Sequence, residues 1–233
     1  MPEYIQGDNH FAKSYQVMKE VLRGDYVETP SRIPFSTPED KNGELTIVCS
    51  LKLGNRTVEI NEKQGVGTLH AFFLGLRSAL FADFQTLKTV TTLSFKQESI
   101  GRQNSISRNP KNDKLYEFGF GVAVKTSLTI KNGKGSEFTF EKTSLDCIQA
   151  PLLLVLEAVL FFVNSEEAYR RARRRFADSK SDSGYIQDSI LPTLTKNNDY
   201  RCIAKSIREE ADKERAKLPK QGGIAMPLKH YND

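Results

Sequence analysis

Residues 45–53 read LTIVCSLKL and are followed by Gly54-Asn55 and by RTVEI at residues 56–60. Apolar and polar side chains alternate in the first segment, which is typical of a strand with one buried face. Gly and Asn favour tight turns because both tolerate a left-handed backbone. The three pieces together predict a β-hairpin.

A helix is predicted directly after this hairpin. The bend Gln64-Gly65-Val66-Gly67 leads into residues 68–81, where apolar side chains recur at helical spacing. These side chains are Leu69, Phe72, Phe73, Leu76 and Leu80. The hairpin and the helix make one strand–strand–helix (ββα) unit.

The same order of elements recurs further along the chain. A strand is predicted at residues 87–97, and the polar residues 98–114 predict a loop. Strands at residues 120–130 and 137–140 then precede an apolar helix at residues 150–164. Two ββα units are expected to pair into one antiparallel sheet with both helices on one face, which is an α+β fold.

The segments on either side of this duplicated region have a different character. Residues 10–23 show helical apolar spacing with Gly24 as the stop, and the prolines of residues 29–38 predict an extended linker. After the apolar helix, composition changes to a charged run that starts at Glu166. A second charged helix is predicted from Asn198, a suitable N-cap, to residue 218.

These patterns divide the chain into residues 1–44, residues 45–166 and residues 167–233. The first region is an N-terminal helix and proline-containing linker, the second is the duplicated ββα domain, and the third is a basic helical tail. Residues 167–220 hold fourteen Lys and Arg against nine Asp and Glu, which equals the net charge of +5 of the whole chain. A basic balance confined to a tail suggests an acidic partner or nucleic acid.

Several classes of protein are excluded by what the sequence lacks. Its longest apolar stretches are too short to span a membrane, and no secretory signal is visible, so a cytoplasmic location is expected. The three cysteines are far apart, and the three histidines have no metal-ligand spacing. No phosphate loop and no nucleophile elbow is present. We therefore expect no metal, no cofactor and no catalytic activity in the isolated chain.

Two helix-opening bends contain candidate binding residues, each with a structural alternative. Gly65 and Gly67 either bring backbone amides close to a small anionic or zwitterionic ligand, or only allow a strand to turn sharply into a helix. Asp146 either binds the ammonium group of a ligand or caps the second apolar helix.

The charged run contains the other candidate residues, which are Arg170, Arg171, Arg173, Arg174 and Arg175. They either grip nucleic-acid phosphates, in which case binding is strongly salt-dependent, or form a solvated helix end whose cations complement the helix dipole. Both apolar helices carry apolar side chains on almost all sides. The face turned away from the sheet is therefore expected to meet a second subunit.

The order of elements and the two bends resemble the C-terminal regulatory, leucine-sensing domain of alpha-isopropylmalate synthase and its citramalate synthase relatives. That family opens its first helix with Gly-x-Gly-Pro-Val-Asp-Ala, and residues 65–71 read GVGTLHA, with His70 in place of the aspartate. It opens its second helix with Thr-Asp-Ile-Val-Glu-Ala-Ser, and residues 145–151 read LDCIQAP, with Leu145 in place of the threonine. The resemblance covers residues 45–169.

The resemblance implies a homodimer whose bends line a pocket for a small branched-chain amino acid or a related 2-oxo acid. The pocket residues implied are Gly65, Gly67, Thr68, Ala71, Asp146 and Ile148. The family's catalytic barrel and its His-x-His metal pair have no counterpart here, so a non-catalytic regulatory or binding module acting in trans on a partner protein is implied. The alternative is a nucleic-acid-binding or protein-interaction protein that uses the arginine-rich tail on a dimeric α+β scaffold.

Overall fold

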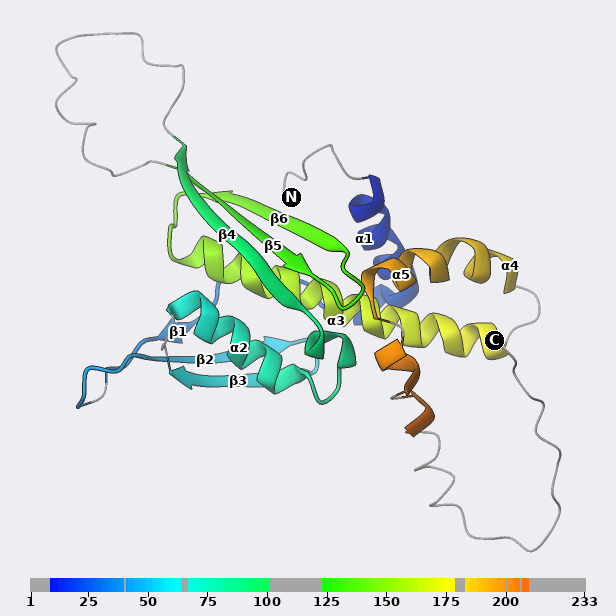
Figure 1. The fold of residues 1–233 in the computed structure, drawn as a ribbon, viewed down its shortest axis with the longest axis horizontal. Coiled ribbons are helices and arrows are strands. Elements are labelled where there is room, and N and C mark those ends of the chain that lie inside the picture. The colour runs from blue at the N-terminus through cyan, green and yellow to red at the C-terminus, as the bar shows by residue number, and fades with distance from the viewer. Residues whose placement is uncertain are drawn as a thin grey trace, which may run out of the picture.

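The computed structural model describes residues 9–39, 41–63, 67–100, 123–178, 183–199, 201–205 and 207–209. The predicted α+β class is confirmed (Figure 1), and the strands within these ranges pair antiparallel. The prediction of one shared sheet is wrong. Within the described residues the strands form two three-stranded sheets, in the orders β1-β2-β3 and β4-β5-β6.

The first sheet is built on the predicted hairpin. Strands β2 (Thr46–Leu53) and β3 (Arg56–Lys63) pair along their whole length, and Gly54 takes a φ of 60° in the turn between them. Strand β1 (Phe35–Ser36) adds to the free edge of β2. The proline-containing linker is therefore part of the fold. Its Ile33 is fully buried, and the backbone N–H and C=O of Ile33 bond to the side chain of Gln149.

Helix α2 (Thr68–Leu80) begins and ends within one residue of its predicted bounds and packs on β3. Its approach to the strand is close at Gly75. A Cβ at that position would lie 2.4 Å from Cγ2 of Ile60. The glycine therefore allows the helix and the sheet to touch, because any side chain there would push them apart.

The second sheet departs in part from the predicted boundaries. Residues predicted to start a strand at Leu87 form the 3-10 helix η2 (Gln85–Lys88), and strand β4 (Thr91–Ile100) follows it. Residues 98–100 of the predicted loop belong to β4, and residues 101–114 lie outside the described residues. Strands β5 (Ala123–Lys131) and β6 (Glu137–Ser144) complete the sheet.

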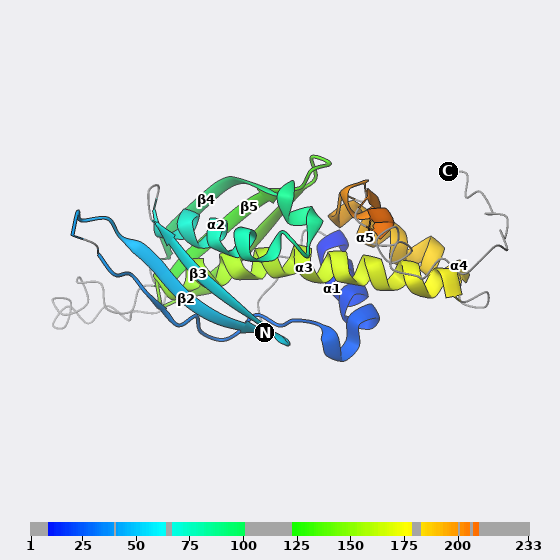
Figure 2. The same ribbon diagram turned by 90° about the horizontal axis from the view of Figure 1, so that it is seen from below.

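Helix α3 (Gln149–Asp178) runs through the centre of the molecule and is twice as long as predicted. It lies between the second sheet on one side and α2 with the first sheet on the other (Figures 1 and 2). Its predicted end near Asn164 is wrong, because the helix continues through the charged run, and part of that run lies inside the fold. Glu166 and Arg170 are both buried and form an ion pair one helical turn apart. The two sheets are separate because this helix occupies the space between them.

The remaining helices gather around the second half of α3 (Figure 2). Helix α1 (Asn9–Leu22) confirms the predicted N-terminal helix and packs on α3 and on α5 (Leu191–Asn197). The ring of Phe11 stacks on Phe161 of α3 with centroids 5.0 Å apart. The predicted glycine stop is only partly right, because Arg23, and not Gly24, takes the positive φ.

The described part of the predicted basic tail packs on the core. A short helix α4 (Ser183–Tyr185), a π-helix η3 (Ile186–Ile190) and α5 follow one another and dock on the core. Three of their apolar side chains, Ile186, Ile190 and Leu194, are buried, and so is Ile203 in the segment that follows α5. Asn198 does not cap the next helix; Asp199 does so, with Oδ1 accepting the N–H of Arg201. Residues 210–218 of that predicted helix lie outside the described residues.

Candidate functional site

Helix α2 opens at a glycine whose backbone conformation few other residues tolerate. Gly67 is the N-cap, with φ 119° and ψ 158°, and its carbonyl accepts the N–H of Ala71 at 3.0 Å. Thr68 is half-buried and Ala71 is buried. The sharp turn from strand to helix therefore accounts for Gly67. Gly65 lies outside the described residues.

Helix α3 opens at Asp146, whose carboxylate caps the helix. Its Oδ1 accepts the N–H of Ile148 at 3.0 Å and that of Gln149 at 2.8 Å. These two hydrogen bonds hold the pKa of Asp146 below its usual value, because they stabilise the charged form, and the bond from Gln149 has the larger effect. The capping interpretation of Asp146 therefore has direct geometric support.

Both helix openings lie at the same end of the molecule, where β4 also ends (Figure 1). Two apolar side chains beside Asp146 stand in solvent there: Leu145 is 72% exposed and Ile148 is 59% exposed. Gln97 of β4 reaches the start of α3 by donating from Nε2 to the carbonyl of Cys147. The structure thus brings the two helix openings to the same end, where Leu145 and Ile148 are exposed and Ala71 is buried.

The five arginines of the charged run have three different environments. Arg170 is buried and donates from Nε and Nη2 to Oε1 of Glu166. Arg171 pairs with Asp25 at 2.8 Å and so ties α3 to the end of α1. The other three, Arg173, Arg174 and Arg175, are exposed. The first two are structural, and only the last three face solvent.

Glu166 is buried and accepts hydrogen bonds from several groups, which the sequence pattern did not predict. Besides Arg170, its carboxylate accepts the backbone N–H of Gln85 at 3.1 Å and that of Thr86 at 2.8 Å. It therefore caps the start of η2, as an acidic residue stabilises the positive end of a helical turn. The i, i+4 spacing of Glu166 and Arg170 predicts an ion pair, but it does not predict that the pair is buried, because surface helices commonly show the same spacing.

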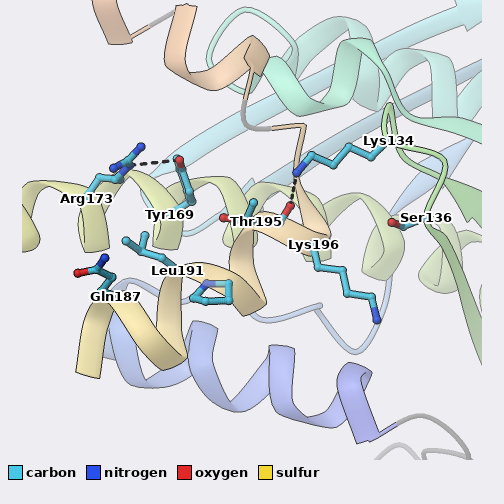
Figure 3. Close-up of a pocket in the computed structure, with 9 residues that line it drawn as sticks. Lys134, Ser136, Tyr169, Arg173, Gln187, Leu191, Thr195 and Lys196 are labelled. Carbon is cyan, nitrogen blue, oxygen red and sulfur yellow. Dashed lines mark hydrogen bonds between the residues drawn. The ribbon is translucent and has the colours of Figure 1, made fainter. Parts of the chain in front are cut away.

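A hollow of about 600 Å³ lies beside the second half of α3. Its walls come from the β5–β6 turn, α3, η3 and α5 (Figure 3). The lining residues are Lys134, Ser136, Tyr169, Arg173, Gln187, Leu191, Pro192, Thr195 and Lys196. Sequence reasoning singled out only Arg173 among them, because the others are brought together by the docking of the tail.

The β5–β6 turn is fastened to the end of α5 through Asn132. Oδ1 of Asn132 accepts the backbone N–H groups of Lys134 and Ser136, which fixes the turn. Nδ2 donates to the carbonyls of Lys196 and Asn197, which lack partners within their own helix. Nζ of Lys134 donates to the carbonyl of Thr195 at 2.9 Å. The turn therefore caps the carboxyl end of α5 and holds the tail in place.

The cysteines of the described part of the chain differ in their surroundings, and no metal-binding group is found there. No group of three or more His, Cys, Asp or Glu is placed there to hold a metal ion. Cys49 is buried in the first sheet, and burial raises the pKa of its thiol to about 11, so it stays protonated at neutral pH. Cys147 is exposed, at the start of α3.

Comparison with known proteins adds no relative to this description. The sequence matches no family model and no curated protein. Among the described helices, none combines the length and the apolar composition that a membrane crossing requires.

Proposed function

We propose that this chain is a non-catalytic, homodimeric binding module that senses a small branched-chain amino acid or a related 2-oxo acid and acts in trans on a partner protein. The resemblance to the regulatory domain of isopropylmalate synthase suggests the ligand class. One structural observation supports the dimer: β4 is exposed along all ten of its residues. It carries Leu93, Phe95 and Ile100, and each of them is exposed.

An exposed edge strand of this length calls for a partner. β4 is the outer strand of the second sheet and pairs only with β5 within the described residues. Such an edge presents unpaired N–H and C=O groups that readily pair with another strand. Pairing with the β4 of a second copy would join the two sheets across a two-fold axis and would cover the exposed apolar side chains.

The charges on β4 favour one register of this pairing. An antiparallel pair centred on Gln97 sets Lys96 opposite Glu98 of the second copy, and the two-fold axis repeats that contact. Moving the centre to residue 96 sets Lys96 opposite Lys96 of the second copy. Moving it to residue 98 sets Glu98 opposite Glu98 of the second copy. Opposite charges stabilise a cross-strand pair and like charges destabilise it.

Charge reversal tests the dimer directly. Lys96→Glu would face Glu98 of the second copy, and we expect dimerisation to weaken about tenfold because two contacts turn repulsive. Adding Glu98→Lys should restore it, while it sets a lysine opposite Lys125 of the same copy, so the stability of the monomer is measured alongside. Within one copy Lys96 lies opposite Ser127, so the reversal costs the monomer little. Lys52→Glu is the matched control, since Lys52 is exposed opposite Thr57. Sedimentation equilibrium measures the association, and a parent chain that is monomeric at all concentrations refutes the dimer.

The ligand part of the proposal has its own test. Calorimetry with leucine, isoleucine and their 2-oxo acids should give a saturable signal on the dimer. Asp146→Ala should weaken it if the carboxylate also contacts the ligand ammonium group. Circular dichroism separates this effect from loss of the helix cap. If none of these compounds binds to the folded dimer, the ligand assignment is wrong and the dimer stands alone.

A second candidate function is nucleic-acid binding through the exposed arginines of α3. The observation that favours it is that Arg173, Arg174 and Arg175 are all exposed near the end of that helix. Removing one cation that touches a phosphate should reduce the slope of log affinity against log salt by about 0.7 for a single strand. Arg174→Gln and Arg175→Gln should each show this change with a short RNA. Affinity that does not depend on salt contradicts this function.

A further inference from the structure

The opening of helix α3 leaves two large apolar side chains in solvent. Leu145 is 72% exposed and Ile148 is 59% exposed, and no other large apolar side chain in the described part of the chain is more exposed than these two. Asp146 lies between them and caps the helix, because its Oδ1 accepts two backbone N–H groups. The surface beside the cap is therefore apolar, and the described residues of one copy leave it uncovered.

Strand β4 is bonded to this opening. Nε2 of Gln97 donates to the carbonyl of Cys147 at 3.0 Å, so the strand and the first turn of α3 are in contact. Gln97 pairs with Thr126 and Phe95 pairs with Leu128, and both of these β5 residues are buried. Because side chains two residues apart share a face of a strand, Phe95 and Gln97 both point to the side of the sheet that α3 covers.

The strand pairing described above places an aromatic ring from the second copy at the same opening. In an antiparallel pair centred on Gln97, residue 95 of one strand lies opposite residue 99 of the other. Phe95 of the second copy would therefore stand beside Ser99, on the α3 side of the sheet and one row of side chains from Gln97. Phe95 is 37% exposed within one copy, so its ring is accessible for such a contact. The two-fold axis repeats the arrangement, because each copy gives and receives one ring.

We propose that the second copy covers the opening of α3, with its Phe95 packed on Leu145 and Ile148. This inference rests on the dimer proposed above and extends its interface from the strand edge to the helix. β4 contributes ten residues a side, whereas a stable protein–protein interface takes about 20 to 30 residues a side. The strand edge alone falls short of this size, and the α3 opening is an exposed apolar surface bonded to the same strand. The candidate binding residue Ile148 then lies between two copies.

Substitution of the two exposed side chains tests the inference in the full chain. Leu145→Ser and Ile148→Ser should each weaken dimerisation about tenfold, because each removes apolar surface that only the dimer buries. Both side chains are mostly exposed in one copy, so the monomer should keep its fold, which circular dichroism checks. Val48→Ser is the matched control: Val48 is exposed on the solvent face of β2, and its variant should associate like the parent. Sedimentation equilibrium measures all three.

A cross-link tests the contact itself. A chain with Phe95→Cys and Cys147→Ser is mixed with a chain that keeps Cys147, which is exposed at the start of α3. Both chains carry Cys202→Ser, and Cys49 is buried. A short bis-maleimide should join the two chains, and mass spectrometry should identify a peptide pair that links position 95 to Cys147. Lys52→Cys in place of Phe95→Cys should give no such pair.

The outcomes separate this inference from the dimer itself. A parent chain that is monomeric at all concentrations overturns both. If Lys96→Glu weakens association but Leu145→Ser and Ile148→Ser do not, the strand pairing stands and the covered opening is overturned. Absence of the link between position 95 and Cys147 in chains that still dimerise also overturns it.

Discussion

At the scale of single residues, buried charge matters most. Glu166 and Arg170 sit inside the molecule, and three groups of donors converge on one carboxylate: the guanidinium and the amides of Gln85 and Thr86. A buried carboxylate is tolerated only when its oxygen atoms are satisfied in this way. This cluster joins α3 to η2, and so it links the long helix to the start of the second sheet.

Removing one partner of the buried pair should therefore be costly. Arg170→Ala leaves the Glu166 carboxylate without its cation, and we expect it to lower the free energy of unfolding by about 3 to 5 kcal/mol. Arg174→Ala, one turn later on the same helix and exposed, should change it by less than about 0.5 kcal/mol. Urea unfolding monitored by circular dichroism measures both. Equal effects of the two variants contradict a structural role for Arg170.

Glu157 provides a pH-dependent prediction. Burial raises the pKa of its carboxyl group, although Lys142 and a hydrogen bond from Tyr15 partly offset this. Its contribution to stability is therefore greatest below the unfolded pKa of about 4.5 and is lost as pH rises through the folded pKa. Glu157→Gln should raise the midpoint of thermal unfolding at pH 7 and lose that advantage near pH 4. A gain that is the same at both pH values argues against a raised pKa.

At the scale of elements, close contacts between backbones decide how helices and strands fit together. Gly75 lets α2 lie directly on Ile60 of β3. Gly133, in the β5–β6 turn, is equally confined, because a Cβ there would lie 2.7 Å from Cβ of Thr89 and 2.8 Å from Oδ2 of Asp199. The second position brings the turn against the segment that follows α5. Both glycines serve packing between elements that are distant in sequence.

Filling the first of these contacts should destabilise the fold. Gly75→Ala forces a methyl group against Ile60, and we expect a loss of about 1 to 3 kcal/mol in the free energy of unfolding. Gly184→Ala is the matched control: Gly184 is also helical, but nothing lies within 4 Å of a Cβ built there. That variant should be neutral or more stable by up to about 1 kcal/mol. If Gly75→Ala destabilises the protein less than Gly184→Ala does, α2 does not contact β3 as described.

At the scale of the whole molecule, the tail and the N-terminal helix complete the core. Helix α3 is buried on nearly all sides because α1 and α5 cover the part that the sheets do not reach. Each fully buried Ile or Leu contributes about 1.5 to 3 kcal/mol. Ile186, Ile190, Leu194 and Ile203 are all buried, so the docking of these segments adds apolar burial to the same core.

A chain cut at the predicted domain boundary should consequently fail to fold. We expect residues 1–166 to lack a cooperative thermal transition and to bind a hydrophobic dye, because the apolar surface of α3 is left uncovered. A chain ending at Glu209 keeps the contacts of α5 and should unfold cooperatively. Differential scanning calorimetry compares the two. Cooperative unfolding of the shorter chain shows that residues 167–233 form a separate unit.

Local structure follows from short-range sequence patterns. Alternation in residues 46–53, the Gly54 turn and the apolar stripe of α2 each depend on neighbours in the chain, so these patterns predict β2 and α2 to within one residue, whereas β3 extends three residues beyond its predicted end. The Asp146 cap follows from local sequence for the same reason.

Contacts between distant segments set which polar residues lie inside and which elements meet. Glu166 and Arg170 look like surface residues until η2 brings its amides to Glu166, and Lys134, Arg173 and Lys196 line one hollow only after α5 docks. The separation of the strands into two sheets is also a long-range outcome, because α3 occupies the space between them. Periodicity reports the contacts of a residue with its own element, whereas burial of charge and assembly of a site depend on contacts across the fold.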